Sequence, residues 1–351
     1  MKRPDLSNSP LEVRVYIQYL EEQIQYYKNS GYKAEKKSLE TSNQEGNASE
    51  LIQETESDAK FVTVTRNGFF KKAPRFLYVR QHRGGIGISD MNSGSTDSPI
   101  SMYSVTDQQH LLVFTNFARV FRFPVSSIPL GGVKSYGIPL FEKTPLAPDE
   151  YIVCLLPDQA RGLIAMLGSS GKVRCLRHHL FGEHMKQGTI MFNWSDFGML
   201  TCATWTPGDA DLMVVTSKGI GIRFNEKLIS PQGDIAIRLS SGDEAVGITS
   251  VYPDDQVFLV GVDGKGTIRK LSGFAPNKTP GGSGKIAFKN DSVVGICAVG
   301  TEDELFLYTK NGKVIRFFAR EVPETDGVVQ GVNCIMLRSD QVTGMFRLPR
   351  I

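Results

Sequence analysis

A repeated β-hairpin pattern dominates the chain from residue 60 onward. Each copy has an apolar, β-branched strand, a short turn and a second strand with basic residues, and the copies begin near residues 61, 111, 163, 212, 257 and 305. The turn positions, 45 to 53 residues apart, are Gly68, Ala118, Gly171, Gly219, Gly264 and Gly312. This period is typical of the blades of a β-propeller. Asn67-Gly68, Asp263-Gly264 and Asn311-Gly312 are dipeptides that favour type I′ hairpin turns.

The repeats predict an all-β fold over residues 60–351, a six-bladed β-pinwheel or propeller-like disc. A unit of roughly four strands is too small to bury its own faces, so each blade needs neighbours around an axis. Closing the ring would also remove most free strand edges. An open two-sheet sandwich is the structural alternative, but it does not explain the regular period.

The first 60 residues differ from the repeats. Within residues 1–32, Ser9, Pro10 and Glu12 form a helix start, and the helix is predicted over about residues 10–29. Its apolar seam consists of Val13, Ile17, Leu20, Ile24 and Tyr27. The seam fits either pairing with another chain or packing on this one. Residues 33–59 are rich in Glu, Ser, Asn and Gln and are predicted to form an acidic, polar, flexible linker.

Composition limits the localisation, the redox state of the cysteines and the cofactors that we expect. The 40 Lys and Arg against 37 Asp and Glu leave a small positive net charge. Neither a signal peptide nor a membrane-spanning run is evident, so we expect a cytoplasmic, nucleoid-associated protein. The five cysteines contain no C-x-x-C pair and are expected to be reduced. Cys175, His178, His179 and His184 lie close in sequence but lack a second ligand pair, so we expect no metal and no other cofactor.

The second strand of every hairpin carries basic residues, which rotation of the repeats would place on one ring around the perimeter. The predicted belt consists of Lys71, Lys72, Arg119, Arg122, Lys172, Arg174, Arg223, Arg269, Lys270, Lys313 and Arg316. Such a belt suits a curved polyanion. The alternative interpretation is that these cations only protect strand edges from aggregation.

The loop after the first hairpin reads Gln81-His82-Arg83-Gly84-Gly85-Ile86-Gly87. It resembles the gyrase box, Q-[RK]-R-G-G-[RK]-G, of the C-terminal domain of DNA gyrase A, and the resemblance extends over about residues 60–347. It implies a six-bladed β-pinwheel that wraps double-stranded DNA around its rim. The box residues implied to contact DNA are Gln81, His82, Arg83, Gly84, Gly85 and Gly87. His82 and Ile86 replace basic residues of the pattern, which leaves open whether a wrap would be chiral.

The resemblance does not extend to catalytic domains. The chain has no Arg-Tyr nucleophile motif and no P-loop spacing, so we expect no enzymatic activity from a free-standing domain of this kind. The predicted function is non-catalytic binding and bending of double-stranded DNA with weak sequence specificity, as a topoisomerase accessory or an architectural protein. The helix at 10–29 would dock on a type II topoisomerase core or on a second copy. A protein-interaction propeller with no DNA role is the alternative.

Overall fold

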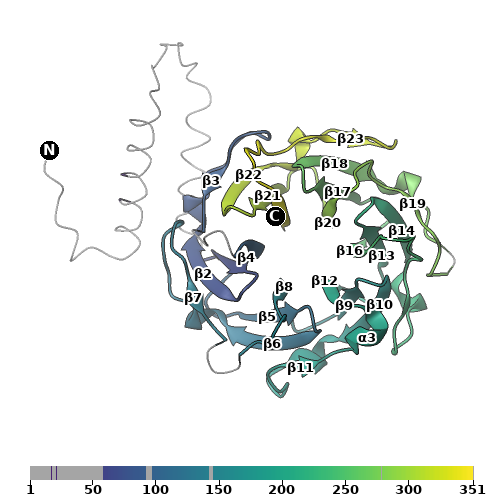
Figure 1. Ribbon diagram of the computed structural model, residues 1–351, viewed down its shortest axis with the longest axis horizontal. Helices are drawn as coiled ribbons and strands as arrows, with labels where there is room; N and C mark the ends of the chain where they lie inside the picture. Colours follow the sequence, from purple (N-terminus) through teal and green to yellow (C-terminus); the bar gives the residue numbers. More distant parts are fainter. Residues whose placement is uncertain are drawn as a thin grey trace, which may run out of the picture.

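The computed structural model describes residues 58–91, 97–141, 145–277 and 279–350, together with Ile17 and Glu21. In this part of the chain, six sheets stand around a common axis as the blades of a closed disc, and their strands pair antiparallel except for β23, which pairs parallel with β18 (Figure 1). The prediction of an all-β, six-bladed disc is therefore confirmed. The predicted helix over 10–29 lies outside the described residues except for Ile17 and Glu21, which are both helical, and the predicted linker lies outside them up to residue 57.

Each blade contains the two strands of one hairpin, an innermost strand and a short outermost strand. Blade 1 consists of β4 (Pro99–Val105), β1 (Lys60–Thr65), β2 (Phe69–Pro74) and β7 (Ile138–Pro139). Blade 2 consists of β8 (Ile152–Pro157), β5 (His110–Thr115), β6 (Arg119–Pro124) and β11 (Thr189–Ile190). Blade 3 consists of β12 (Leu200–Thr206), β9 (Leu163–Gly168), β10 (Lys172–Arg177) and β15 (Asp234–Ile235).

The other three blades follow the same plan. Blade 4 consists of β16 (Ala245–Val251), β13 (Asp211–Thr216), β14 (Ile220–Asn225) and β19 (Lys285–Ile286). Blade 5 consists of β20 (Val293–Val299), β17 (Gln256–Gly261), β18 (Lys265–Lys270), β23 (Glu324–Thr325) and β24 (Val332–Asn333). Blade 6 consists of β25 (Val342–Leu348), β21 (Glu304–Thr309), β22 (Lys313–Phe318) and β3 (Ile88–Ser89).

Short helices follow the second strands of the hairpins. The 3-10 helices are η1 (Arg75–Leu77), η2 (Val125–Ser127), η3 (His178–Phe181), η4 (Glu226–Leu228), η5 (Leu271–Gly273) and η6 (Ala319–Glu321), and a single α-helical turn is α3 (Trp194–Phe197). From each 3-10 helix the chain runs back along the outside of the preceding blade. We call these outer segments the rim loops: residues 75–90, 125–141, 178–192, 226–239, 271–290 (residue 278 lies outside the described residues) and 319–338.

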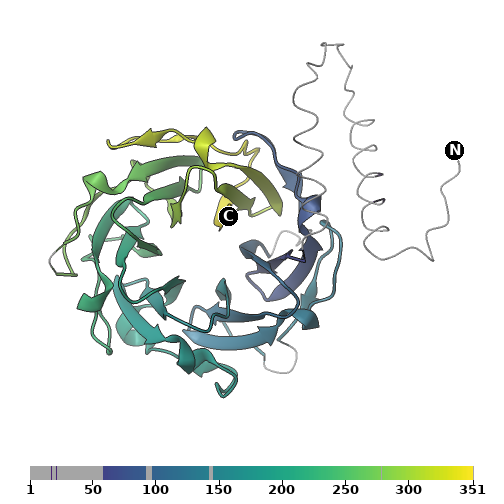
Figure 2. The ribbon, with the colours of Figure 1, turned by 180° about the vertical axis from the view of Figure 1, so that it is seen from behind.

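The outermost strand of each blade is supplied by the rim loop of the next repeat. β7 follows the second hairpin in sequence, yet Ile138 pairs with Phe70 of blade 1. By the same exchange, β3 of the first repeat pairs with β22 of blade 6, with Ile88 opposite Val314, and this pairing closes the ring. Both views of the disc show the first and last blades side by side (Figures 1 and 2).

The hairpin turns differ in detail from the prediction. The loop between β1 and β2 has three residues, Gly68 N donates to Thr65 O, and Gly68 adopts φ +86° while Asn67 has no positive φ. A type I′ turn needs positive φ at both central residues, so the type I′ prediction is wrong and each turn has one left-handed residue. Ala118 adopts φ +56° at this position in blade 2.

Apolar side chains fill the space between neighbouring blades. At the closing junction, Phe61 packs edge-on against Tyr78 and Phe306, with ring centroids 5.1 and 5.0 Å apart. Phe346 of β25 completes this aromatic cluster. Blades 6 and 1 therefore share a core in addition to the β3–β22 pairing.

Candidate nucleic-acid interface

The box loop, residues 81–87, crosses from blade 1 to blade 6 just before β3. Its main chain is tied to the last repeat, because Gln81 N donates to Arg316 O at 2.7 Å and Gly84 N donates to Cys334 O at 2.7 Å. Gly87 adopts φ +76°, and a Cβ there would lie 2.8 Å from Val314 O. A glycine is needed at this position so that the chain can turn into β3 against blade 6.

The two side chains after Gln81 have different environments. Arg83 donates through Nε to Glu321 O and through Nη1 to Asn333 O at 3.2 Å. The His82 side chain is 98% exposed, with Nδ1 3.2 Å from Glu321 Oε2. Arg83 thus helps to hold the ring closed, whereas His82 faces solvent. A DNA contact by the box residues stays a prediction.

The predicted belt of exposed cations is wrong at five positions. Five side chains of the predicted belt are only 1 to 5% exposed: Lys71, Lys72, Arg223, Arg269 and Arg316. The second strand of each hairpin is covered by the outermost strand and its rim loop, so side chains on it meet protein rather than solvent. Lys71, for example, forms a buried ion pair with Asp90; burial lowers the pKa of Lys71 and the Asp90 charge opposes that shift.

Cations on the second strands join neighbouring blades. At the fourth position of the second strand, Lys72 pairs with Asp107 and donates to Val125 O of the next blade at 3.2 Å. Arg122 Nε lies 2.8 Å from Asp158, in the turn that leads into blade 3. Arg223 donates to Phe274 O, which follows the hairpin of blade 5, at 3.3 Å. We call this contact, made by the cation at the fourth position of one blade's second strand with the next blade or the turn leading into it, the inter-blade bridge. The sequence carried a sign of it, because acidic turns precede most hairpins.

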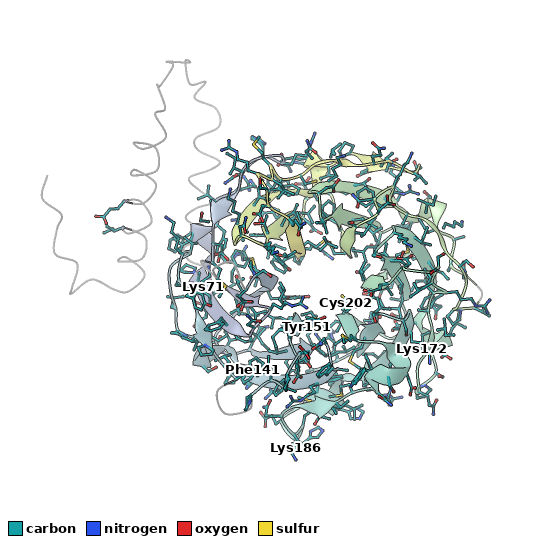
Figure 3. The ribbon with its side chains drawn as sticks, in the orientation of Figure 1. Lys71, Phe141, Tyr151, Lys172, Lys186 and Cys202 are labelled. Atoms are coloured by element: carbon teal, nitrogen blue, oxygen red, sulfur yellow. The ribbon has the colours of Figure 1, made fainter. Side chains whose placement is uncertain are left out.

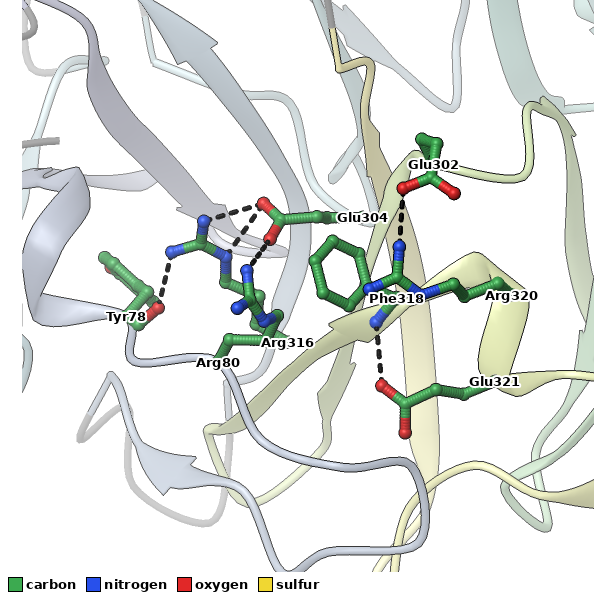
Figure 4. Close-up of polar contacts among 8 residues, drawn as sticks. All are labelled: Tyr78, Arg80, Glu302, Glu304, Arg316, Phe318, Arg320 and Glu321. Atoms are coloured by element: carbon green, nitrogen blue, oxygen red, sulfur yellow. Dashed lines mark hydrogen bonds and ion pairs between the residues drawn. The ribbon is translucent and has the colours of Figure 1, made fainter. Parts of the chain in front are cut away.

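The bridge at the closing junction is the most extensive (Figure 4). Arg316 Nη2 lies 2.6 Å from Glu304 Oε2, and Arg316 Nη1 donates to Tyr78 O of the first repeat at 2.9 Å. Arg80 reaches the other oxygen of Glu304 at 3.1 Å and lies 4.0 Å from the ring centroid of Phe318. Guanidinium groups from the first and the last repeat, those of Arg80 and Arg316, therefore share one carboxylate.

The remaining residues of the predicted belt are half-buried. Arg119 pairs with Glu150 at 2.6 Å, and Lys270 lies 3.6 Å from Glu324. Arg174 donates to Pro231 O at 3.0 Å, and Lys172 lies 5.6 Å from the Phe197 ring centroid. Lys313 is also half-buried. With Arg122, these side chains keep some contact with solvent, and their binding of DNA stays a prediction.

Sequence reasoning missed the cations that the rim loops expose. Among the described residues, they are Lys134, Lys186, Lys227, Arg238, Lys285 and Lys289 on blades 1 to 4, and Arg320 and Arg338 on blade 5. Lys186 lies at the outer edge of the disc in Figure 3, whereas Tyr151 and Cys202 lie toward its centre. A charge count over each rim loop would have found this surface, because residues 75–89, 125–141 and 271–290 contain no Asp or Glu.

The innermost strands surround a cavity of about 590 Å³. Cys154, Cys202 and Cys297 line it with Tyr103, and burial raises the pKa of each of these thiols, that of Cys297 to about 12. Protonated thiols are poor nucleophiles and poor metal ligands. Within the described ranges, no group of three His, Cys, Asp or Glu side chains is placed to hold a metal ion. Among those residues, no helix is long and apolar enough to cross a membrane.

Known proteins share these features over parts of the chain. Residues 59–97, 109–153, 210–251 and 303–346 match the model of the family described as "DNA gyrase C-terminal domain, beta-propeller". The DNA gyrase A protein of Staphylococcus aureus strain MRSA252 is 28% identical over 295 residues, which cover 80% of this chain and 33% of that protein. The same values hold for the protein from strain NCTC 8325. The chain thus spans about a third of the length of these relatives.

Two solved structures share the fold. The structure of a DNA gyrase A C-terminal domain superposes with a TM-score of 0.74 at 22% identity, covering 83% of this chain and all of that one. The C-terminal domain of a DNA topoisomerase IV gives a TM-score of 0.61 at 18% identity, covering 83% of this chain and 93% of that one.

Proposed function

We propose that this chain, which matches the DNA gyrase C-terminal domain family model in four segments, binds double-stranded DNA along the rim of its disc and bends it. The observation that carries the proposal is the row of exposed cations on the rim loops, including Lys134, Lys186 and Lys285. Cations on a convex surface attract the phosphates of a duplex that curves around it. Base reading is not expected, because most contacts from such a surface reach phosphates.

The charge on the rim suggests where the DNA runs. The rim loops that lie on blades 6, 1 and 4 carry no acidic residue up to Ser89, Phe141 and Asn290. The rim loop on blade 5, residues 319–338, contains three acidic residues, Glu321, Glu324 and Asp326, against two arginines, Arg320 and Arg338. Like charges repel phosphates, so the contact arc is proposed to run from blade 6 through blades 1, 2 and 3 to blade 4 and to leave out blade 5.

Bending has an energetic requirement that the rim must meet. Curving 20 to 30 bp by 40 to 90° costs about 1–6 kcal/mol. Charge-assisted hydrogen bonds from several rim cations offset this cost. A partial arc over five blades is proposed to meet this requirement without base contacts.

A salt titration tests the proposal. Fluorescence anisotropy of a labelled duplex should show an affinity loss of roughly 10³- to 10⁵-fold between 50 and 200 mM salt if about 6–10 phosphates are contacted. Lys186→Gln should reduce the salt slope by about one. Arg66→Gln, which removes an exposed arginine at the central cavity, is the matched control and should leave the slope unchanged. Equal losses at both sites would contradict the rim assignment.

A docking role for the N-terminal residues is proposed from their sequence alone. The helix over 10–29 is proposed to dock on a type II topoisomerase core or on a second copy, with residues 33–59 as its tether, so that the disc contributes to DNA topology control without catalysis of its own. Removing residues 1–32 should leave duplex affinity intact and abolish any self-association measured by sedimentation. Loss of duplex binding on truncation would contradict this division of labour.

A second candidate function is docking of a protein partner. It is favoured by one apolar side chain at the same place on three outermost strands, namely Ile190, Ile235 and Ile286, which are 63%, 45% and 50% exposed. Ile235→Lys separates the two functions. If DNA lies on this rim, the added charge should raise duplex affinity; if the rim serves only a protein, duplex affinity should not change.

A further inference from the structure

The junction between blades 3 and 4 departs from the inter-blade bridge of its neighbours. Blade 3 has Cys175 at the strand position where blades 2 and 4 have Arg122 and Arg223. A thiol is much smaller than a guanidinium side chain and does not reach across to blade 4. A groove of about 760 Å³ lies here, with Cys175 and Glu226 in its lining.

The floor of the groove is held by Glu226 at the start of η4. Glu226 is 4% exposed, and its Oε1 accepts hydrogen bonds from Gly208 N at 2.9 Å and Ala210 N at 2.7 Å. Its Oε2 is buried and has no hydrogen-bond partner. Burial and the Glu226 charge raise the pKa of Cys175 to about 12, so the thiol adds no negative charge to the floor.

Basic side chains surround the mouth of the groove. They come from β10, η3 and η4 and consist of Arg174, Arg177, His178, His179 and Lys227. Arg177, His179 and Lys227 are exposed. Arg174 is fixed by its bond to Pro231 O and by another to Met191 O, so its charge has a set position. Glu226 is the acidic residue in this lining, and two backbone N–H groups already bind one of its oxygens.

We propose that this groove binds a phosphate group and that, when DNA lies on the rim, it seats a backbone phosphate of the duplex. Arginine guanidinium groups offer paired N–H donors that match phosphate oxygens, and lysine and histidine add further donors. The groove lies on the contact arc between the rim loops that carry Lys186 and Arg238. The DNA assignment rests on the proposed function, whereas phosphate binding by the groove does not.

Inorganic phosphate tests the groove without DNA. The ring resonances of His178 and His179 are followed by NMR while phosphate replaces chloride at constant ionic strength. The wild-type protein should give a saturable shift, Arg177→Gln should weaken the apparent affinity at least fivefold, and Arg338→Gln, on the rim loop of blade 5, should leave it unchanged. A linear shift without saturation, or equal weakening by both substitutions, would overturn the site. Unchanged thermal unfolding of both variants excludes a folding defect.

Duplex DNA then identifies the source of the phosphate. If the groove seats a backbone phosphate, Arg177→Gln should lower the salt slope of duplex binding by about one, and Arg338→Gln should not. Saturable phosphate binding with an unchanged duplex slope would overturn the DNA assignment and assign the groove to free phosphate. If the wild-type protein binds phosphate but no duplex, the proposed function fails together with the DNA assignment, while the phosphate site stands.

Discussion

Two junctions on opposite sides of the ring use the same repeat in contrasting ways. At the closing junction, Arg316 joins Glu304 to Tyr78 O, and an aromatic core and β3 add to the contact. At the junction of blades 3 and 4, Cys175 stands in the bridging position and a groove is open. One strand position can therefore close a junction with a buried charge or leave space for a ligand, depending on the length of a single side chain.

The largest effect is expected from breaking the closing bridge. Glu304→Gln would leave Arg316 buried beside a neutral amide, and removal of one partner from a buried ion pair destabilises a protein by about 3–5 kcal/mol. Urea unfolding should show this loss. Glu302→Gln is the control, because its pair with Arg320 is about half exposed, and it should change the free energy of unfolding by roughly 0–1 kcal/mol. Similar losses from both would refute a special role for the closing junction.

A smaller loss is expected when β3 is disturbed. Gly87→Ala would place a Cβ 2.8 Å from Val314 O at a left-handed φ, with an expected cost of about 1–3 kcal/mol. Hydrogen exchange of the β3 and β22 amides should become faster. Gly132→Ala has open space around the new Cβ and no left-handed φ, so it should leave exchange unchanged. Unaltered protection in the Gly87 variant would mean that β3 does not hold the ring closed.

Placing a cation at the junction of blades 3 and 4, where the other junction has Arg316, should raise the free energy of unfolding. Cys175→Arg would bring a guanidinium to the unpartnered Oε2 of Glu226, and a net gain of about 1 kcal/mol is expected from a charge-assisted hydrogen bond. Cys175→Leu adds volume without a donor and should gain less. If the two variants have equal free energies of unfolding, packing rather than the absent bridge distinguishes this junction.

The smallest effect concerns two thiols, Cys175 at the groove between blades 3 and 4 and Cys334 in the core between blades 5 and 6. The pKa of Cys175 and that of Cys334 are both raised by burial from about 9.0 to about 12, so at pH 8 the thiolate fraction falls on the order of 10³-fold. Both should react slowly with iodoacetamide, as followed by mass spectrometry. Cys175 is half-buried and Cys334 is fully buried, so Cys175 should react first. Faster modification of Cys334 would indicate that the core between blades 5 and 6 opens.

The sequence was sufficient to predict the hairpin of each blade, but not how neighbouring blades exchange their outermost strands. Hairpins such as residues 61–72 show β-branched strands around a turn, which local chemistry determines. The outermost strands have two residues each, too few to show a period, and β7 pairs with a strand of the preceding repeat. Neither the exchange of strands nor closure by β3 was therefore predictable from pattern.

The candidate site was harder to predict than the fold. Lys72 and Lys186 look alike in sequence, yet Lys72 is buried beside Asp107 and Lys186 is exposed on a rim loop. Which one meets solvent depends on the strand that covers β2, and that strand comes from the following repeat. The gyrase-box resemblance drew attention to residues 81–87, but only the structure shows Arg83 bound to two carbonyl groups of the rim loop 319–338.

Ring closure of short DNA tests the central claim, that the rim binds a duplex and bends it, most directly. A duplex of about 150 bp, near the persistence length, is joined by ligase with and without saturating protein at 50 mM salt. The account predicts faster circularisation with the protein, a loss of the effect at 200 mM salt, and a smaller effect with Lys186→Gln than with Arg66→Gln. Saturating binding with no change in the circularisation rate would contradict it.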